Sequence, residues 1–319
     1  MAQRRKTKGA IRRRLAARRA GRVGRHGSST VLSRAVDRAT QWPSSLREQP
    51  FVPHLCLLRA PAVPMAPRVM GSTLTVATYN VHRWTGMNGR RRADPARAGF
   101  VLSEMDADVF ALQEVIRPFS GDDPLGSIAD ALGMHLAFAV TRMHKRGQLG
   151  NAILSRFPIS GISVLDISHS RLERRGALAA QFEPRDGERF GVIATHLSLV
   201  DRTRRRQVEE LLQHPQFDAG PAVLLGDMNS WRDCPATRKL DEHLGKHHNE
   251  EWPASFPAPR PMLALDRIYA REAKIVEVYS HDSPAARKAS DHLPVVARIE
   301  LDPASREFEE SAESAESES

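Results

Sequence analysis

The sequence has little cysteine and no long apolar run. Cys56 and Cys234 are the only cysteines among 319 residues, which excludes a disulfide framework and a cysteine-based zinc site and fits a reducing compartment. No stretch approaches the ~18 consecutive apolar residues of a transmembrane helix. The basic N-terminus is not followed by an uninterrupted apolar segment, so we expect no secretory signal. These absences predict a cytoplasmic protein, with a peripheral membrane association left open.

The middle of the chain also lacks net charge. The formal charge of +9 reflects 47 basic and 38 acidic residues. Residues 1–70 hold sixteen basic and two acidic side chains, a charge of +14, whereas residues 302–319 hold one and seven, a charge of −6. Residues 71–301 keep 30 basic and 29 acidic side chains, a charge of only +1. The basicity that would suggest a nucleic-acid partner therefore belongs to one end of the chain.

These charge blocks predict three segments. Residues 1–70 are expected to be a mostly disordered basic arm that contacts nucleic acid or an anionic membrane. Alternatively, the arm lies upstream of the true start, because Met65 and Met70 both precede the first predicted strand. Residues 71–301 are long enough to bury the core of one large domain. The acidic, Ser-rich residues 302–319 are expected to be a disordered tail.

Apolar and β-branched segments alternate with a few helical ones between the two ends. Helical spacing and capping residues predict helices at Asp94–Met105, Ile128–Leu132, Thr203–Gln213 and Cys234–Leu244. Strands are predicted at Leu74–Val81, Asp108–Val115, Met134–Thr141, Asn151–Ser155, Ile159–Ile167, Gly176–Glu183, Arg189–Leu197, Ala222–Leu225, Leu265–Ala270, Ile275–Ser280 and Leu293–Leu301. So many strands with few helices predict two packed sheets covered by helices.

Polar side chains recur where the apolar strands end, which is where an α/β scaffold presents a site. The set comprises Asn80, Glu114, His196, Asp227, Asn229, Asp266, Asp291 and His292. Each alone has an ordinary explanation as a turn residue, a solvated carboxylate or a structural histidine. Together, carboxylates suit a hard cation such as Mg²⁺ or Mn²⁺, histidines suit a phosphate, and an Asp near an Asn suits holding and deprotonating water. This combination indicates metal-assisted phosphoester hydrolysis.

The chain resembles the endonuclease/exonuclease/phosphatase superfamily. The resemblance rests on seven segments that occur in the family's order and cover 71–301: Ala77-Thr78-Tyr79-Asn80, Leu112-Gln113-Glu114, Gly150–Ser155, Thr195-His196-Leu197, Gly226-Asp227-Met228-Asn229, Leu265–Ile268 and Ser290–Pro294. Any one of these segments would be weak support, but the ordered set is specific. The fold that it implies is a four-layered α/β/β/α sandwich with two packed mixed β-sheets and disordered tails.

The resemblance implies a metal site. Glu114 would be the principal ligand of Mg²⁺ (or Mn²⁺), and Asn80 beside it would help to hold the metal or the phosphate. Asp291 would support the metal or the leaving-group side. The protein would therefore be a metal-dependent phosphoesterase.

The resemblance also implies the catalytic residues. Asp227 would orient or deprotonate the attacking water, and Asn229 would help to fix that water. His292 would contact the scissile phosphate, with Asp266 bonded to its other ring nitrogen. His196 would be a second phosphate contact, so that two imidazolium groups would stabilise the developing charge.

Three further residues are weaker candidates for substrate binding. Asn151 matches the family and is expected to line the site, while His82 lies two residues past Asn80 on the same strand face. Arg175 could reach a substrate phosphate, although a surface arginine is the commoner role. The run Arg204-Arg205-Arg206 opens a helix and is predicted to be a solvated face.

The motifs identify a reaction class and leave the substrate open. The segments around Thr195–Leu212 and Ser255–Ile268 look like the sphingomyelinase-like bacterial branch, and the body has almost no net charge, so we favour a lipid or small phosphodiester. The alternatives are a DNA or RNA endonuclease or exonuclease and a catalytically inactive binding module. We expect a bacterial protein, from its excess of Arg over Lys, and a monomer.

Overall fold

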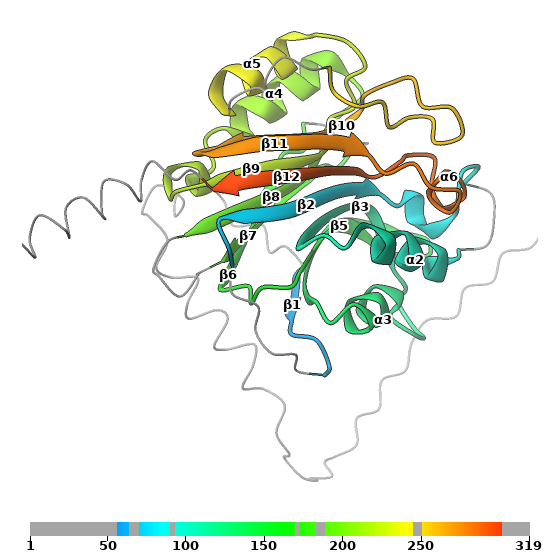
Figure 1. The fold of residues 1–319 in the computed structure, drawn as a ribbon. Helices are drawn as coiled ribbons and strands as arrows, with labels where there is room; N and C mark the ends of the chain where they lie inside the picture. The colour runs from blue at the N-terminus through cyan, green and yellow to red at the C-terminus, as the bar shows by residue number, and fades with distance from the viewer. Residues whose placement is uncertain are drawn as a thin grey trace, which may run out of the picture. The chain divides into compact units, whose positions relative to one another are not determined.

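The computed structural model describes residues 56–63, 70–89, 93–169, 173–182, 189–244 and 251–301. Two β-sheets lie at the centre of this part of the chain (Figure 1). Most of the predicted arm 1–70 and the whole predicted tail 302–319 fall outside the described residues.

The larger sheet has seven strands in the order β1-β4-β5-β3-β2-β12-β11. Its strands are β1 (Cys56–Arg59), β2 (Thr73–Asn80), β3 (Val109–Arg117), β4 (His135–His144), β5 (Gly147–Ser155), β11 (Ala273–Ser280) and β12 (Val295–Leu301). The smaller sheet has five strands in the order β10-β9-β8-β7-β6. These are β6 (Gly161–Asp166), β7 (Gly176–Phe182), β8 (Phe190–His196), β9 (Ala222–Asp227) and β10 (Asp266–Arg271).

Helices cover the outer face of each sheet. The larger sheet carries α2 (Pro95–Met105), α3 (Pro124–Ala131) and the short α6 (Ala286–Ala289), and the smaller sheet carries α4 (Asp201–Leu211) and α5 (Pro235–Leu244). Two short 3-10 turns, η3 (His82–Trp84) and η4 (Pro215–Asp218), lie in connections. The predicted four-layered α/β/β/α sandwich with two mixed sheets is therefore confirmed.

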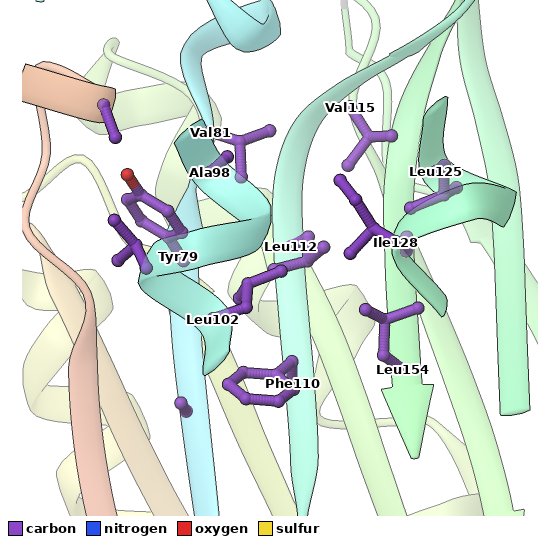
Figure 2. Packing of buried hydrophobic residues seen from close by; sticks show 14 of the residues in the cluster. Tyr79, Val81, Ala98, Leu102, Phe110, Leu112, Val115, Leu125, Ile128 and Leu154 are labelled. Carbon is purple, nitrogen blue, oxygen red and sulfur yellow. The ribbon is translucent and has the colours of Figure 1, made fainter. Parts of the chain in front are cut away.

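Three buried apolar clusters hold the layers together. One lies between the larger sheet and α2 and α3, where Leu102 and Ile128 point from the helices onto Leu112 and Leu154 (Figure 2). A second fills the space between the two sheets, and a third lies under α4 and α5. Burial of this much apolar surface is the main stabilising contribution and fixes the strand ends rigidly.

Parallel pairing brings the polar strand ends to one side of the sandwich. β2 pairs in parallel with β3, which places Asn80 opposite Gln113, and β8 pairs in parallel with β9, which places His196 opposite Asp227. β10 runs antiparallel to β9, so that its first residue, Asp266, also lies opposite Asp227. We call this side, on the right in Figure 1 where the loop before β10 and α6 lie, the catalytic edge.

One strand lies in the segment predicted to be a disordered arm. Cys56–Arg59 forms β1 and pairs antiparallel with the outer side of β4. Leu57 packs against the core under α2 and α3, and Arg59 forms an ion pair with Asp130 of α3. The prediction for residues 1–70 is therefore wrong at this strand, because four residues without clear periodicity gained their structure from a sheet edge.

The hairpin of β4 and β5 is longer than predicted. The two strands continue to His144 and start again at Gly147, although the sequence here is polar and rich in Lys and Arg. Backbone pairing extends the strands because Arg117 of β3 pairs with Gln148 of β5. This extension carries the hairpin tip to the catalytic edge. Within the described ranges, no helix is both long and apolar enough to cross a membrane.

Candidate active site

Asp227 and Asn229 lie in a tight turn at the end of β9. Asn229 adopts a left-handed backbone conformation (φ 50°), and its backbone N–H donates to Oδ1 of Asp227 at 2.9 Å. Its side-chain Nδ2 donates to the carbonyl of Leu197 at 2.9 Å. Gly226 is required before this turn, because a Cβ there would collide with the carbonyl oxygen of Thr195 on β8. The Gly-Asp-x-Asn segment therefore encodes a rigid turn that aims both polar side chains.

Asp227 is the buried centre of the site. Its Oδ2 accepts a hydrogen bond from Nδ2 of Asn80 at 3.1 Å and lies 3.4 Å from Nε2 of His196 and 3.7 Å from Nε2 of His292. Burial raises the pKa of Asp227 to about 6, although the charge of His292 favours the ionised form. The carboxyl group is thus ionised at neutral pH but retains the basicity needed to accept a proton.

His292 is held between two carboxyl groups. Its Nδ1 lies 2.7 Å from Oδ2 of Asp266, to which Ser255 Oγ donates at 2.6 Å. The ring of Phe256 packs 5.0 Å from the imidazole. Burial by itself lowers the pKa of His292, but the charges of Asp266 and Asp227 outweigh it and raise the pKa to about 10. His292 is therefore positively charged, and its Nε2 lies beside the carboxylate of Asp227.

His196 differs from His292 in its neighbours. Arg175 lies with its NH1 3.2 Å from Nδ1 of His196, and the same guanidinium pairs with Glu173 at 3.0 Å. Burial, together with the charge of Arg175, lowers the pKa of His196 well below its usual value. Nδ1 accepts from Arg175, so the ring proton of neutral His196 lies on Nε2, facing Asp227. The expectation of two imidazolium groups is therefore wrong for His196, which offers a hydrogen bond without a charge.

Glu114 lies in an irregular part of β3. Its backbone has a positive φ of 53°, and the pairing of β3 with β5 shifts register between Leu112 and Val115. Its Oε2 lies 3.1 Å from Nε of Arg83. Arg83 belongs to the left-handed turn η3, which is anchored by a hydrogen bond from Trp84 Nε1 to the carbonyl of Ile116 at 2.8 Å. Such strained conformations persist only where surrounding contacts enforce them, and they cluster at functional sites.

Asp291 and Asn80 are joined through His82. The ring Nδ1 of His82 lies 3.1 Å from Oδ1 of Asp291, while its backbone N–H donates to Oδ1 of Asn80 at 3.0 Å. Ser290 Oγ donates to the backbone carbonyl of Asn80 at 2.6 Å. Burial tends to raise the pKa of Asp291, but the hydrogen bond from His82 and the charge of His292 lower it. His82 thus touches two of the three predicted metal-site residues.

Two sets of side chains could hold a metal ion. Asp227, Asp266 and His292 offer ligand atoms within 4.8 Å of one another. However, Oδ2 of Asp266 lies 2.7 Å from Nδ1 of His292, and the positive charge of that imidazole disfavours a cation beside it. Glu114 and Asp291 are carboxylates whose side chains are each 25% exposed, and Oδ1 of neighbouring Asn80 retains an acceptor position. Hard oxygen donors suit Mg²⁺, so the donor chemistry of this second set fits the predicted metal.

A cavity opens beside these residues. A hollow of about 30 Å³ is lined by Glu114, Asn151 and His196, and it shares Asn151 and Arg175 with an adjoining cavity of about 360 Å³ between β4 and β7. Asn151 is buried and donates from Nδ2 to the carbonyl of Gly176 at 2.8 Å, which ties β5 to β7. Asn151 and Arg175 therefore line the same hollow as Glu114 and His196.

Sequence reasoning missed a buried arginine. Arg204 is 1% exposed and donates from NH1 to the carbonyls of Ser198 at 2.9 Å and Asn229 at 2.7 Å. The prediction of a solvated face is wrong for this residue, although Arg205 and Arg206 are exposed. Arg204 precedes the buried Val208 and Leu211 by four and seven residues, so helical spacing could have placed it on their face.

Comparison with known proteins now decides the family. The sequence model of the Endonuclease/Exonuclease/phosphatase family matches residues 77–292. The chain belongs to this family. Its matched range contains every residue of the candidate site, from Asn80 to His292. Members of the family are generally phosphoester hydrolases, so the site described above is that of a phosphoesterase.

Individual relatives agree with this assignment. The uncharacterized protein YbhP of Escherichia coli is 30% identical over 253 residues, which cover 71% of this chain and 96% of YbhP. An endonuclease/exonuclease/phosphatase from Beutenbergia cavernae shares the fold with a TM-score of 0.57, at 24% identity over 73% of this chain and 72% of that one. The catalytic domain of human Nocturnin, solved with a bound sulfate anion, has a TM-score of 0.56 at 19% identity over 73% of this chain and 96% of that domain.

Proposed function

We propose that this protein is a divalent-metal-dependent phosphodiesterase that acts on a lipid or another small phosphodiester. The observation that carries the proposal is the buried chain Asp266–His292–Asp227, in which His292 Nδ1 lies 2.7 Å from Asp266 and Nε2 lies 3.7 Å from Asp227. Asn80 and Asn229 hold the two oxygens of Asp227 in place. A base and a cation are thereby fixed side by side on rigid strand ends.

Asp227, His292 and Asp266, together with His196, each have a role when water attacks the phosphorus. Asp227 accepts a proton from the water as the new P–O bond forms and the bond to the leaving oxygen breaks. The positive charge of His292 stabilises the negative charge that accumulates on the phosphoryl oxygens. His196 donates a hydrogen bond from Nε2, and Asp266 keeps the His292 ring oriented. Removing one such group typically reduces the rate by a factor on the order of 100 to 1,000.

Glu114 and Asp291, with Asn80, would hold Mg²⁺ or Mn²⁺. When bound, the ion would act as a Lewis acid that stabilises charge on the phosphate. Arg83, which pairs with Glu114 at 3.1 Å, and His82, which touches Asp291, would keep these carboxylates oriented.

The size and lining of the adjoining cavity support the proposal that the substrate is a small molecule. Its volume of about 360 Å³ is at the lower end of the range for small-molecule sites. Arg142, Arg174 and Arg175 line it beside apolar Val164 and Leu165. Such a lining suits the anionic and apolar parts of one small phosphodiester, whereas specific binding of a duplex buries roughly 1,000–2,500 Å² of protein surface.

Turnover of bis-p-nitrophenyl phosphate under metal control tests the proposal. We expect activity that requires Mg²⁺ or Mn²⁺ and disappears in EDTA, with a loss of roughly a hundredfold or more in Glu114→Gln. Glu104→Gln is the matched control, since its side chain is also 25% exposed but lies on α2. Undiminished turnover in EDTA, or in Glu114→Gln, would contradict the metal mechanism.

A substrate panel tests the finer assignment. Phospholipid and sphingomyelin should be cleaved faster than plasmid DNA or RNA. Preference for nucleic acid would favour the nuclease alternative instead. Absence of metal-dependent turnover with every phosphoester would favour an inactive binding module.

A further inference from the structure

Large apolar side chains are exposed mainly at the catalytic edge. Twelve such side chains are exposed in the described part of the chain, and seven of them lie on loops or strand ends at this edge: Met87, Phe119, Met143, Leu199, Val200, Trp231 and Met262. Singly exposed apolar residues are ordinary on a protein surface. A cluster of exposed apolar side chains around one site, however, indicates a surface that binds a partner.

Three of the loops that carry these side chains are tied together. Leu199 and Val200 follow His196, Trp231 follows Asn229, and Met262 precedes Asp266. Arg232 joins the first two loops through an ion pair of 3.0 Å with Asp201. The backbone bond from Met228 to the carbonyl of Leu265, at 2.8 Å, and a bond from Arg267 to the carbonyl of Ser230, at 3.0 Å, join the second loop to the third. The apolar tips therefore project together from the elements that hold the catalytic residues.

Exposed basic side chains lie on loops, on strand ends and on α4 at the same edge. Arg142, Lys145, Arg146, Arg202, Arg206 and Arg260 are exposed and form no ion pair with any residue that the structure describes. Nearby carboxylates are neutralised: Asp201 pairs with Arg204 and Arg232, and Asp233 pairs with Arg238 at 2.7 Å. The catalytic edge thus combines apolar tips with cations that have no ion-pair partner among the described residues, although residues 71–301 carry a net charge of only +1.

We propose that the catalytic edge docks onto an anionic lipid bilayer. Leu199, Val200, Trp231 and Met262 would enter the headgroup region, where Trp is favoured, while the arginines contact lipid phosphates. The inference rests on the proposed function and names its substrate as a phosphodiester presented by a membrane.

Other occupants fit this surface less well. Single-stranded nucleic acid is bound by aromatic rings that stack on bases, and Leu199, Val200 and Met262 have no ring to stack. A second copy of the chain would need a continuous apolar face, whereas the exposed charged residues Arg202 and Arg260 lie two positions from Val200 and Met262 in the sequence.

Vesicle binding by the full-length protein tests the inference without any catalysis. Sedimentation would compare phosphatidylcholine vesicles with and without phosphatidylglycerol, for the native protein and a Trp231→Ser, Met262→Ser double variant. We expect binding to the anionic vesicles, a blue shift of tryptophan fluorescence that is absent in the double variant, and a loss of about tenfold or more in partition for that variant. The control is Phe100→Ser, which removes an apolar side chain that is 58% exposed on α2 and should leave partition unchanged.

The outcomes separate docking from chemistry. Native-like partition of the double variant, or an equal loss in Phe100→Ser, would overturn the docking surface even if bis-p-nitrophenyl phosphate is hydrolysed. Weakened binding of single-stranded DNA by the double variant, or dissociation of a dimer in gel filtration, with vesicle binding unchanged, would also overturn it. Tip-dependent vesicle binding without turnover of any phosphodiester would refute the proposed function and leave the docking surface standing.

Discussion

At the scale of single residues, His214 links stability to pH far from any predicted metal ligand. Its Nδ1 accepts from the backbone N–H of Gln216 at 3.1 Å, and its Nε2 lies 2.8 Å from Ser163 Oγ. Burial lowers the pKa of His214 to about 4, so the unfolded chain takes up a proton that the folded chain refuses. We expect this group to reduce the free energy of unfolding by about 3 kcal/mol as pH falls from 6.5 to 4, with no further change below pH 4.

Denaturant unfolding at several pH values measures this effect. His214→Asn should flatten the curve between pH 6.5 and 4, because Asn can accept the same backbone bond without titrating. His243→Asn, at an exposed position on α5, should leave the native pH dependence intact. The same slope in His214→Asn as in the native protein would show that another group is responsible.

At the scale of elements, α4 holds the loops that follow β8 and β9 through Arg204. Arg204→Met should lower the free energy of unfolding by roughly 2–4 kcal/mol, since the buried carbonyls of Ser198 and Asn229 lose their donor. It should also lower kcat more than KM, because one of these loops directly follows His196 and the other carries Asn229. The exposed neighbour Arg205, paired with Glu209, is the control, and Arg205→Met should cost at most about 0.5 kcal/mol. Equal effects of the two substitutions in urea unfolding would contradict this role.

At the scale of the whole molecule, the start of the folded domain lies before Gly71. We propose that the domain begins near β1. Removing β1 would expose the edge of β4 to solvent and leave Asp130 without its ion-pair partner Arg59. A chain starting at Met70 should melt about 3 °C or more below one starting at Pro50. Turnover per folded molecule should be unchanged, because three strands separate β1 from β2. Identical melting temperatures in calorimetry would show that β1 contributes nothing.

The local signals predicted much of this protein. The apolar strands, the Asp94 cap with Pro95 and the polar residues after each strand predicted the layered fold and the site set, because these features depend on neighbours in sequence. The Gly-Asp-x-Asn segment predicted a turn for the same reason. The neutral body and the two charged ends also follow from the sequence alone, because net charge is a sum over residues.

Only the tertiary structure decided the protonation, the burial and the surface clustering of these side chains, because each depends on its neighbours in space. Burial beside Arg175 makes His196 neutral, whereas Asp266 and Asp227 make His292 a cation, although the two histidines look equivalent in the sequence. Distant strands bring Asn80 to Asp227 and hide Arg204 among carbonyls. The apolar tips and exposed cations of the catalytic edge come from segments scattered over the chain. Net charge is additive along a sequence, but pKa, burial and surface clustering depend on which side chains the fold places together.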